Sequence, residues 1–325
     1  MYVCDCWRHA RGKLEARAAD AFCDAGQGLS SRVPTRLAVM VVNGAREQCS
    51  IASNGSGRLQ HQSEIEFAAL SDVGLQRQRN EDFSAYWEPD GANELRRKGI
   101  LAIVADGMGG YEGGQEASQI AVETLRETFV NARGTPHALL VSGMKAAHER
   151  IREYARYNPR LFGMGTTCTA ACVVRGHLYF AHLGDSRLYL VHEGKISRLT
   201  RDHSYVGRLI ESGLIDPTDA ETHPQRHILT AALGVGDDPI PDTPLEPLPL
   251  QNGDVLLLCT DGLWGLVKDE ELRETVMRHA PESACRQLVE LAKNRGAPDN
   301  ITLQLLRFMG NGAGSTTTPL GTSGD

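Results

Sequence analysis

The chain has 325 residues, 41% hydrophobic and 23% charged, which is enough for one large or two modest globular domains. Its formal net charge of −7 gives no indication of the clustered basic face that nucleic-acid binding requires. It has no apolar run of about 18 residues for a membrane span, and residues 1–20 lack the apolar core of a signal peptide, so we expect a cytoplasmic protein without membrane partners.

Hydrophobic periodicity predicts the first regular elements after residue 64. Strands are expected at 65–73 and 100–105, the second as a nearly continuous apolar run. Helical spacing of apolar residues begins at Gly113 and recurs from Leu140 to Tyr154, which predicts two helices.

Three predicted strands then follow in series, at residues 166–174, 177–183 and 186–191. Their connections are so short that we expect consecutive strands to be antiparallel neighbours. The remaining predicted elements are two strands and two helices, at residues 254–259, 301–308, 269–279 and 282–293. Runs of strands with separate helix pairs favour the α+β class.

Composition also predicts the domain boundaries. Residues 1–63 show no sustained periodicity and are expected to be a poorly ordered extension, although the apolar run 37–42 could be a strand. Residues 64–309 form the predicted folded domain. Residues 310–325 are rich in Gly, Thr and Ser and predict a disordered tail.

Acidic residues recur beside several of these predicted strands. They are Glu81 and Asp82, Asp106, Asp185, Asp261, and Asp299. A lone Asp-Gly pair is usually a turn. Their joint occurrence, in order and in similar local settings, instead indicates the oxygen ligands of one or two hard cations such as Mg²⁺ or Mn²⁺.

Two such ions sharing a carboxylate can convert a water molecule to hydroxide, which attacks phosphorus without a covalent enzyme intermediate. The sequence fits this route, since it contains neither a Gly-x-Ser-x-Gly elbow nor a Cys-x5-Arg arrangement. Arg77 lies three residues before Asn80 and could clamp a phosphate bidentately. Taken alone, Arg77 would be read as a solvated surface charge.

Other metal and nucleotide motifs are absent from the sequence. The glycine-rich stretch 107–114 is not followed by the Gly-Lys-Ser/Thr of a P-loop, and the 11 histidines contain no His-Glu-x-x-His. The eight cysteines contain no Cys-x-x-Cys pair, and we expect all of them to be reduced.

From about Glu64 to Phe308 the chain resembles the metal-dependent protein serine/threonine phosphatases of the PP2C (PPM) type. The segments that carry the resemblance are Ser71–Gly74, Arg77–Asp82, Val104–Gly110, Gly163–Thr167, Gly184–Arg187, Thr200–Ser204, Ala232–Gly234, Thr260–Trp264 and Asp299–Thr302. The resemblance implies a four-layer αββα sandwich of two antiparallel sheets flanked by helix pairs, with the metals at one end between the sheets.

The resemblance also implies the metal ligands. Asp106 would bridge two ions, Mn²⁺ or Mg²⁺, and Gly107 would contribute its carbonyl oxygen. Asp261 and Asp299 would complete the shell of one ion, and Glu81 would serve the other.

Further roles follow from the same resemblance. Asp82 would orient metal-bound water, Asp185 with Asp261 would form a weaker third-metal position, and Arg77 would bind the substrate phosphate. Residues 202–223 would form a flap beside the site. Animal members have a histidine in place of Met108 as a candidate general acid; the methionine favours the bacterial branch, with water protonating the leaving oxygen.

The implied activity is hydrolysis of phosphoserine and phosphothreonine on proteins, by a monomer that opposes a Ser/Thr kinase. One alternative is a binding module that has lost catalysis, which the complete set of acids disfavours. Another is a phosphatase dedicated to one partner, such as an anti-sigma antagonist or a secretion-system component. The sequence does not select the substrate.

Overall fold

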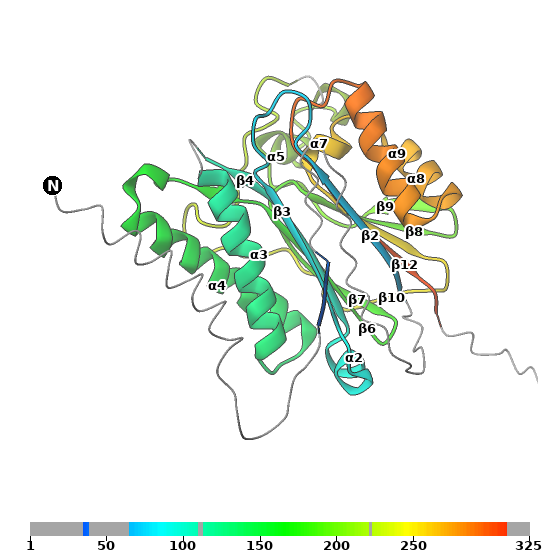
Figure 1. Ribbon diagram of the computed structural model, residues 1–325. Helices are drawn as coiled ribbons and strands as arrows, with labels where there is room; N and C mark the ends of the chain where they lie inside the picture. The colour runs from blue at the N-terminus through cyan, green and yellow to red at the C-terminus, as the bar shows by residue number, and fades with distance from the viewer. Residues whose placement is uncertain (1–34, 39–64, 110–112, 221–222, 311–325) are drawn as a thin grey trace, which may run out of the picture. The chain divides into compact units, whose positions relative to one another are not determined.

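The computed structural model describes residues 35–38, 65–109, 113–220 and 223–310. Every described residue belongs to one unit of the chain, which begins at residue 35. Within that unit two antiparallel sheets lie face to face, with helices on the outer face of each (Figure 1). The predicted α+β sandwich of four layers is confirmed.

The first sheet is antiparallel and carries the longer pair of helices on its outer face. Its strands in spatial order are β1 (Thr35–Ala38), β3 (Asp82–Pro89), β4 (Ile100–Met108), β6 (Cys168–Val174), β7 (His177–Leu183) and β10 (Leu248–Pro249), with β5 (Gly165–Thr166) paired to the end of β4. The helices of this half are α2 (Ala92–Lys98), α3 (Gly113–Asn131), α4 (Pro136–Tyr157) and the 3₁₀ turn η1 (Pro159–Leu161).

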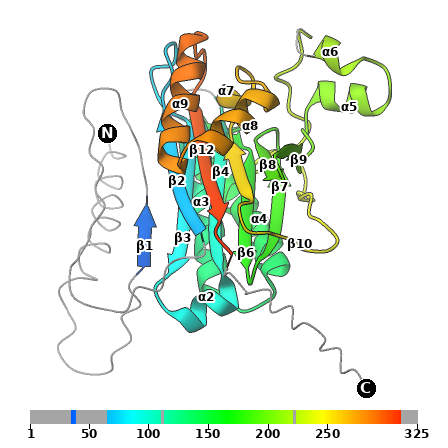
Figure 2. The same ribbon diagram turned by 90° about the vertical axis from the view of Figure 1, so that its right-hand side faces the viewer.

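The second sheet has five strands. Their spatial order is β2 (Ile65–Asp72), β12 (Ile301–Phe308), β11 (Val255–Cys259), β8 (Arg187–His192) and β9 (Lys195–Arg198). Its outer face is covered by α7 (Asp261–Trp264), α8 (Asp269–Arg278) and α9 (Pro281–Asn294). Two short helices, α5 (Tyr205–Glu211) and α6 (Pro217–Ala220), project away from the sandwich in Figure 2.

Alternation along each strand sorts the apolar side chains into separate cores. On β4, Leu101 and Ile103 pack beneath α3 and α4, whereas Ala102 and Val104 face the second sheet. On β11, Leu256 and Leu258 face the first sheet and pack in the same core as Ala102 and Val104. Because successive side chains of a strand point to opposite faces, each strand contributes to two cores.

The same alternation places the acids. Asp106 follows Ala102 and Val104 at two-residue spacing on β4, and Asp82 precedes Tyr86 at the same parity on β3. Both carboxylates therefore belong to the layer between the sheets, at the end where the apolar residues stop. Asp82 and Asp106 are direct partners across the β3–β4 ladder.

One predicted pairing is wrong. The strands at 177–183 and 186–191 are not neighbours, because β7 belongs to the first sheet and β8 to the second. The chain crosses between the sheets at Gly184, which has φ +109° and lies so close to Thr167 that an added Cβ would be 2.5 Å from the Thr167 Cβ. The crossing puts Asp185 at the end of the inter-sheet layer instead of in a hairpin turn.

The other predicted strands and helices are confirmed, with ends that shift by a few residues and a break at Thr167 that separates β5 from β6. The elements that periodicity did not predict are short or carry polar residues, as β3, β9, β10, α2, α5, α6 and α7 do. Part of the apolar run 37–42 belongs to β1, which pairs with β3. The rest of the predicted N-terminal extension and nearly all of the C-terminal tail lie outside the described residues.

Two further expectations concern cysteines and membranes. Cys168, Cys172, Cys259 and Cys285 are buried free thiols, and the other four cysteines lie outside the described residues. Among the helices that the structure describes, none has the length and apolar character needed to span a bilayer.

Candidate metal and phosphate site

Five of the predicted acids come from five different connections of the sandwich. Asp82 begins β3, Asp106 lies near the end of β4, and Asp185 lies in the crossing from β7 to β8. Asp261 begins α7 two residues after the end of β11, and Asp299 lies two residues before the start of β12. These segments are brought to the same end of the two sheets.

The backbone around Asp106 is fixed by neighbouring threonines. Its N–H donates to Thr167 Oγ1 at 2.9 Å, and its carbonyl accepts from Thr166 Oγ1 at 2.8 Å and from the Thr167 N–H at 2.9 Å. The main-chain groups of Asp106 are thus bound by β5 and the residue that follows, and its side chain makes a hydrogen bond with Asp261 that lowers the pKa of Asp261 against the effect of burial.

Asp82 is a buried carboxylate with only one of its oxygens paired. Thr260 Oγ1 donates to Asp82 Oδ2 at 2.8 Å, whereas Oδ1 has no hydrogen-bond partner. Burial raises the pKa of Asp82 from 3.8 to about 7, with a further increase from the charges of Asp261 and Asp299 and an opposing effect of the threonine hydroxyls.

Three more carboxylates show the same electrostatic pattern. Burial raises the pKa of Asp106 and of Asp185 well above the usual range, and burial also raises the pKa of Asp261. Each is raised further by its acidic neighbours, which for Asp106 include Asp82 and Asp185. Like charges held in a poorly solvated place disfavour ionisation, so the four groups form one electrostatic unit.

Glu81 lies at the outer side of this unit, and its main chain contacts Gly107. The Gly107 N–H donates to the Glu81 carbonyl at 3.1 Å. A Cβ on Gly107 would lie 2.6 Å from that carbonyl oxygen and 2.0 Å from the Gly114 carbonyl oxygen, so a side chain cannot be accommodated there. Burial raises the pKa of Glu81, while the positive charge of Arg77 lowers it.

Arg77 forms the cationic side of the site. Its Nη2 lies 2.7 Å from Asp299 Oδ2, and the two side chains are 49% and 35% exposed. An ion pair this open to solvent contributes little to stability, about 0–1 kcal/mol. The guanidinium is therefore free to exchange Asp299 for another anion at small cost.

The donor set fits divalent cations. Asp82 Oδ1 and Asp261 Oδ1 are buried oxygens without hydrogen-bond partners, in a place where carboxylates repel one another. A hard cation with oxygen ligands satisfies both requirements. Among the described side chains, no group of three or more His, Cys, Asp or Glu residues lies in an arrangement that would hold a metal ion as it stands.

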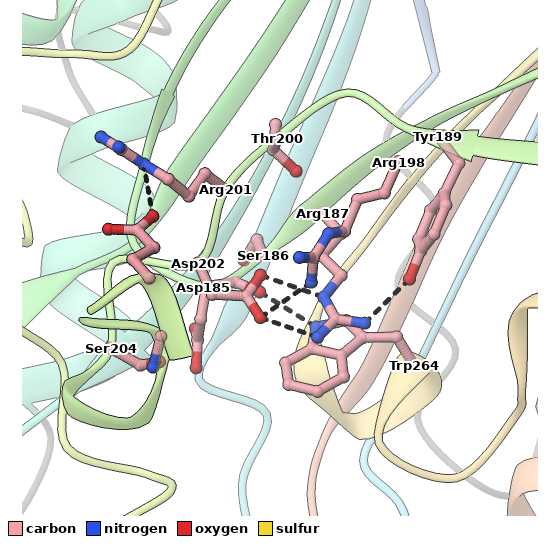
Figure 3. Close-up of polar contacts among 12 residues, drawn as sticks. Asp185, Ser186, Arg187, Tyr189, Arg198, Thr200, Arg201, Asp202, Ser204 and Trp264 are labelled. Carbon is pink, nitrogen blue, oxygen red and sulfur yellow. Dashed lines mark hydrogen bonds and ion pairs between the residues drawn. The ribbon is translucent and has the colours of Figure 1, made fainter. Parts of the chain in front are cut away.

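A further group of contacts connects Asp185 to the residues that directly precede α5. Figure 3 shows the Arg187 guanidinium lying between the Asp202 carboxylate and the Trp264 indole. Arg187 donates to both Asp202 oxygens, at 3.0 and 2.7 Å, and its Cζ lies 3.5 Å from the centre of the Trp264 ring. Trp264 Nε1 in turn donates to the Asp185 carbonyl at 3.0 Å.

Several residues at the site had no role in the sequence analysis. Asn300 Oδ1 accepts from the Glu81 N–H at 2.8 Å, and its Nδ2 donates to the Val73 and Arg79 carbonyls, both at 2.9 Å. Thr260 holds Asp82 as described above. Both lie next to predicted metal ligands in sequence and within segments that carry the family resemblance, and these were the available signals.

The sequence matches a known family over most of the described domain. Residues 76–301 match the family Protein phosphatase 2C. The chain belongs to the protein phosphatase 2C family. The predicted resemblance is thereby confirmed.

The chain is similar to protein phosphatases from several bacteria. Protein phosphatase PhpP of Streptococcus pneumoniae is 32% identical over 247 residues, which cover 74% of this chain and 97% of PhpP. The crystal structure of the Mycobacterium tuberculosis serine/threonine phosphatase PstP/Ppp has a TM-score of 0.68 and 34% identity, covering 76% of this chain and 99% of that one. A structure of the PstP catalytic domain in complex with two manganese ions has a TM-score of 0.66 and 32% identity over the same shares.

We expect the protein in EDTA to lose stability as the pH rises. Because the pKa of Asp82 is raised from 3.8 to about 7, the folded protein binds a proton that the unfolded chain releases between these values. The free energy of unfolding should therefore fall across this window and level off above it. At about 1.4 kcal/mol per pKa unit, the loss from Asp82 is on the order of a few kcal/mol.

Calorimetric melting in EDTA from pH 5 to pH 8 measures this dependence. The Asp82→Asn variant should show a flatter profile, because an amide has no charge to develop. Equal slopes for the two proteins would show that Asp82 does not titrate as the structure implies.

A second expectation concerns Arg187. Arg187→Lys removes one of the two bonds to Asp202 and the planar contact with Trp264, so the free energy of unfolding should fall by about 1–3 kcal/mol. Arg198 contacts the same Asp202 oxygen at 3.1 Å but is 39% exposed, so Arg198→Lys should cost less than about 1 kcal/mol. Urea denaturation of both variants measures the difference, and equal losses would contradict a special role for the Arg187 contact.

Proposed function

We propose that this protein is a metal-dependent phosphatase that hydrolyses phosphoserine and phosphothreonine on other proteins. The observation that carries the proposal is the group of buried carboxylates at the end of the inter-sheet layer, two of which have unpaired oxygens, with Arg77 beside them. The relatives named protein phosphatases support the substrate class.

The proposed ligands are acids at this end of the inter-sheet layer, in the roles that the family resemblance implies. Asp106 would be shared by two ions, and Gly107 would contribute its carbonyl oxygen. Asp261 and Asp299 would be ligands of one ion, and Glu81 would be a ligand of the other. Two such ions supply an activated water molecule and positive charge for the reacting phosphate. Manganese is favoured by the two ions in the PstP structure, while magnesium accepts the same oxygen ligands. Asp185 with Asp261 is the proposed third position.

The remaining residues would bind the substrate phosphate and orient water. Arg77 would leave Asp299 and clamp the phosphate, because a guanidinium matches two phosphate oxygens at once. Asp82, with Oδ2 held by Thr260, would use its unpaired Oδ1 to orient water. Met108 has no proton to donate, so the leaving serine or threonine oxygen would take its proton from water.

We further propose a cytoplasmic monomer that opposes a Ser/Thr kinase. The four buried free thiols support a reducing compartment. The kinase-opposing role is supported by the bacterial serine/threonine phosphatases to which the chain is similar.

Phosphate release from a phosphothreonine peptide tests the proposal. We expect turnover with Mn²⁺, loss of turnover in EDTA, and recovery on adding Mn²⁺ back. Asp106→Asn should reduce kcat about a thousandfold, since metal ions contribute several kcal/mol of transition-state stabilisation. Asp237→Asn is the matched control, because Asp237 is exposed and outside the site.

Circular dichroism of Asp106→Asn would establish that the variant is folded. Turnover that persists both in EDTA and in folded Asp106→Asn would contradict the proposal.

A further inference from the structure

A cleft of about 890 Å³ opens beside the carboxylates. Its described lining includes Arg77, Arg79, Glu81, Gly109, Arg160 and Leu161. The first three come from the connection between β2 and β3, and the last two from η1, which follows α4. The cleft therefore joins the proposed phosphate ligand Arg77 to a segment about 80 residues away in sequence.

The charge of this cleft is unusual for the molecule. Three of the residues named above are arginines and one is a carboxylate, although the whole chain has a formal net charge of −7. The positive charge of Arg79 is felt at Glu81, where it contributes to lowering the pKa against the effect of burial. A single exposed arginine is usually a solvated surface charge, but three in one concave surface concentrate an attractive potential for anions.

Only one of these arginines is needed for the reacting phosphate. Arg77 lies next to Asp299 and Glu81, so a phosphate bound there leaves Arg160 to face the rest of the substrate. Arg160 is exposed at the surface, and its backbone lies in a segment that ends at Gly165, where β5 pairs with the end of β4. The short η1 segment is thus attached to the same strand that carries Asp106.

We propose that Arg160 forms a subsite for a second anionic group on the same phosphopeptide. This inference rests on the proposed function, because it assumes that the reacting phosphate lies at Arg77. A cleft of this volume spans on the order of 10 Å, the length of about three extended residues. The second group is therefore an acidic side chain or a second phosphate within a few residues of the reacting phosphothreonine.

The exposure of the arginines determines how strongly the enzyme should prefer a peptide with a second anionic group over a neutral one. Exposed ion pairs are weak and are screened by salt. We expect the subsite to raise kcat/KM roughly fivefold for one added carboxylate, and more for a phosphate, because it has more charge and matches the guanidinium geometry. The preference should decline as the salt concentration is raised.

The experiment compares phosphothreonine peptides with neutral flanks, with glutamate three residues before or after the phosphothreonine, and with phosphoserine at those positions. Loss of the phosphothreonine phosphate in Mn²⁺, followed by mass spectrometry so that it is separated from hydrolysis of the added phosphoserine, gives kcat/KM for each peptide. The measured quantity is the ratio of this value for the charged peptide to that for the neutral peptide. The wild-type protein should favour glutamate and phosphoserine on one side. Arg160→Glu should abolish or invert that ratio, and Arg160→Gln should reduce it.

Arg156→Glu is the matched control. Arg156 is exposed on α4 four residues earlier and does not line the cleft, so the same charge reversal there should leave the ratio unchanged. A ratio near one in the wild-type protein, an unchanged ratio in Arg160→Glu, or an equal loss in Arg156→Glu would overturn the inference. Each of these results leaves the proposed phosphatase activity intact, whereas no phosphate release from any peptide would overturn the proposed function itself.

Discussion

Carboxylates buried close together are the constraint on which the rest of this structure depends. Asp82, Asp106, Asp185 and Asp261 occupy a place where water solvates them poorly and where each raises the pKa of its neighbours. Burial of unpaired charge is expensive, so such a group persists in a fold when a cation compensates it. Unpaired oxygens on Asp82 and Asp261 show that the protein itself does not provide all of the compensation.

The sandwich makes this arrangement possible by simple alternation. Inner-face positions of the strands are apolar through the middle of the layer and become acidic or hydroxyl-bearing at one end, as Val104 and Asp106 show on β4. The apolar part of the layer stabilises the fold, and the polar end holds the acids that are proposed to bind the metal ions. The crossing of the chain between sheets at Gly184 adds Asp185 from the opposite side, and the Arg187–Asp202–Trp264 contacts hold that crossing to the root of the α5–α6 segment.

The sequence was sufficient to predict the class of fold, most long strands and helices, and the acids that gather at the site. These are encoded locally, by periodicity and by short acidic motifs. The pairing of β7 with β8 was predicted wrongly, because a three-residue connection looks like a hairpin when the position of Thr167 is unknown. Arg160 could not be connected to Arg77 from sequence, since their shared cleft arises from the tertiary fold.

Anomalous scattering from a crystal grown with Mn²⁺ tests the central claim most directly. The account predicts two strong peaks at the polar end of the inter-sheet layer, both within coordinating distance of Asp106. Density without any peak at that end, or ions bound by none of the predicted acids, would contradict it.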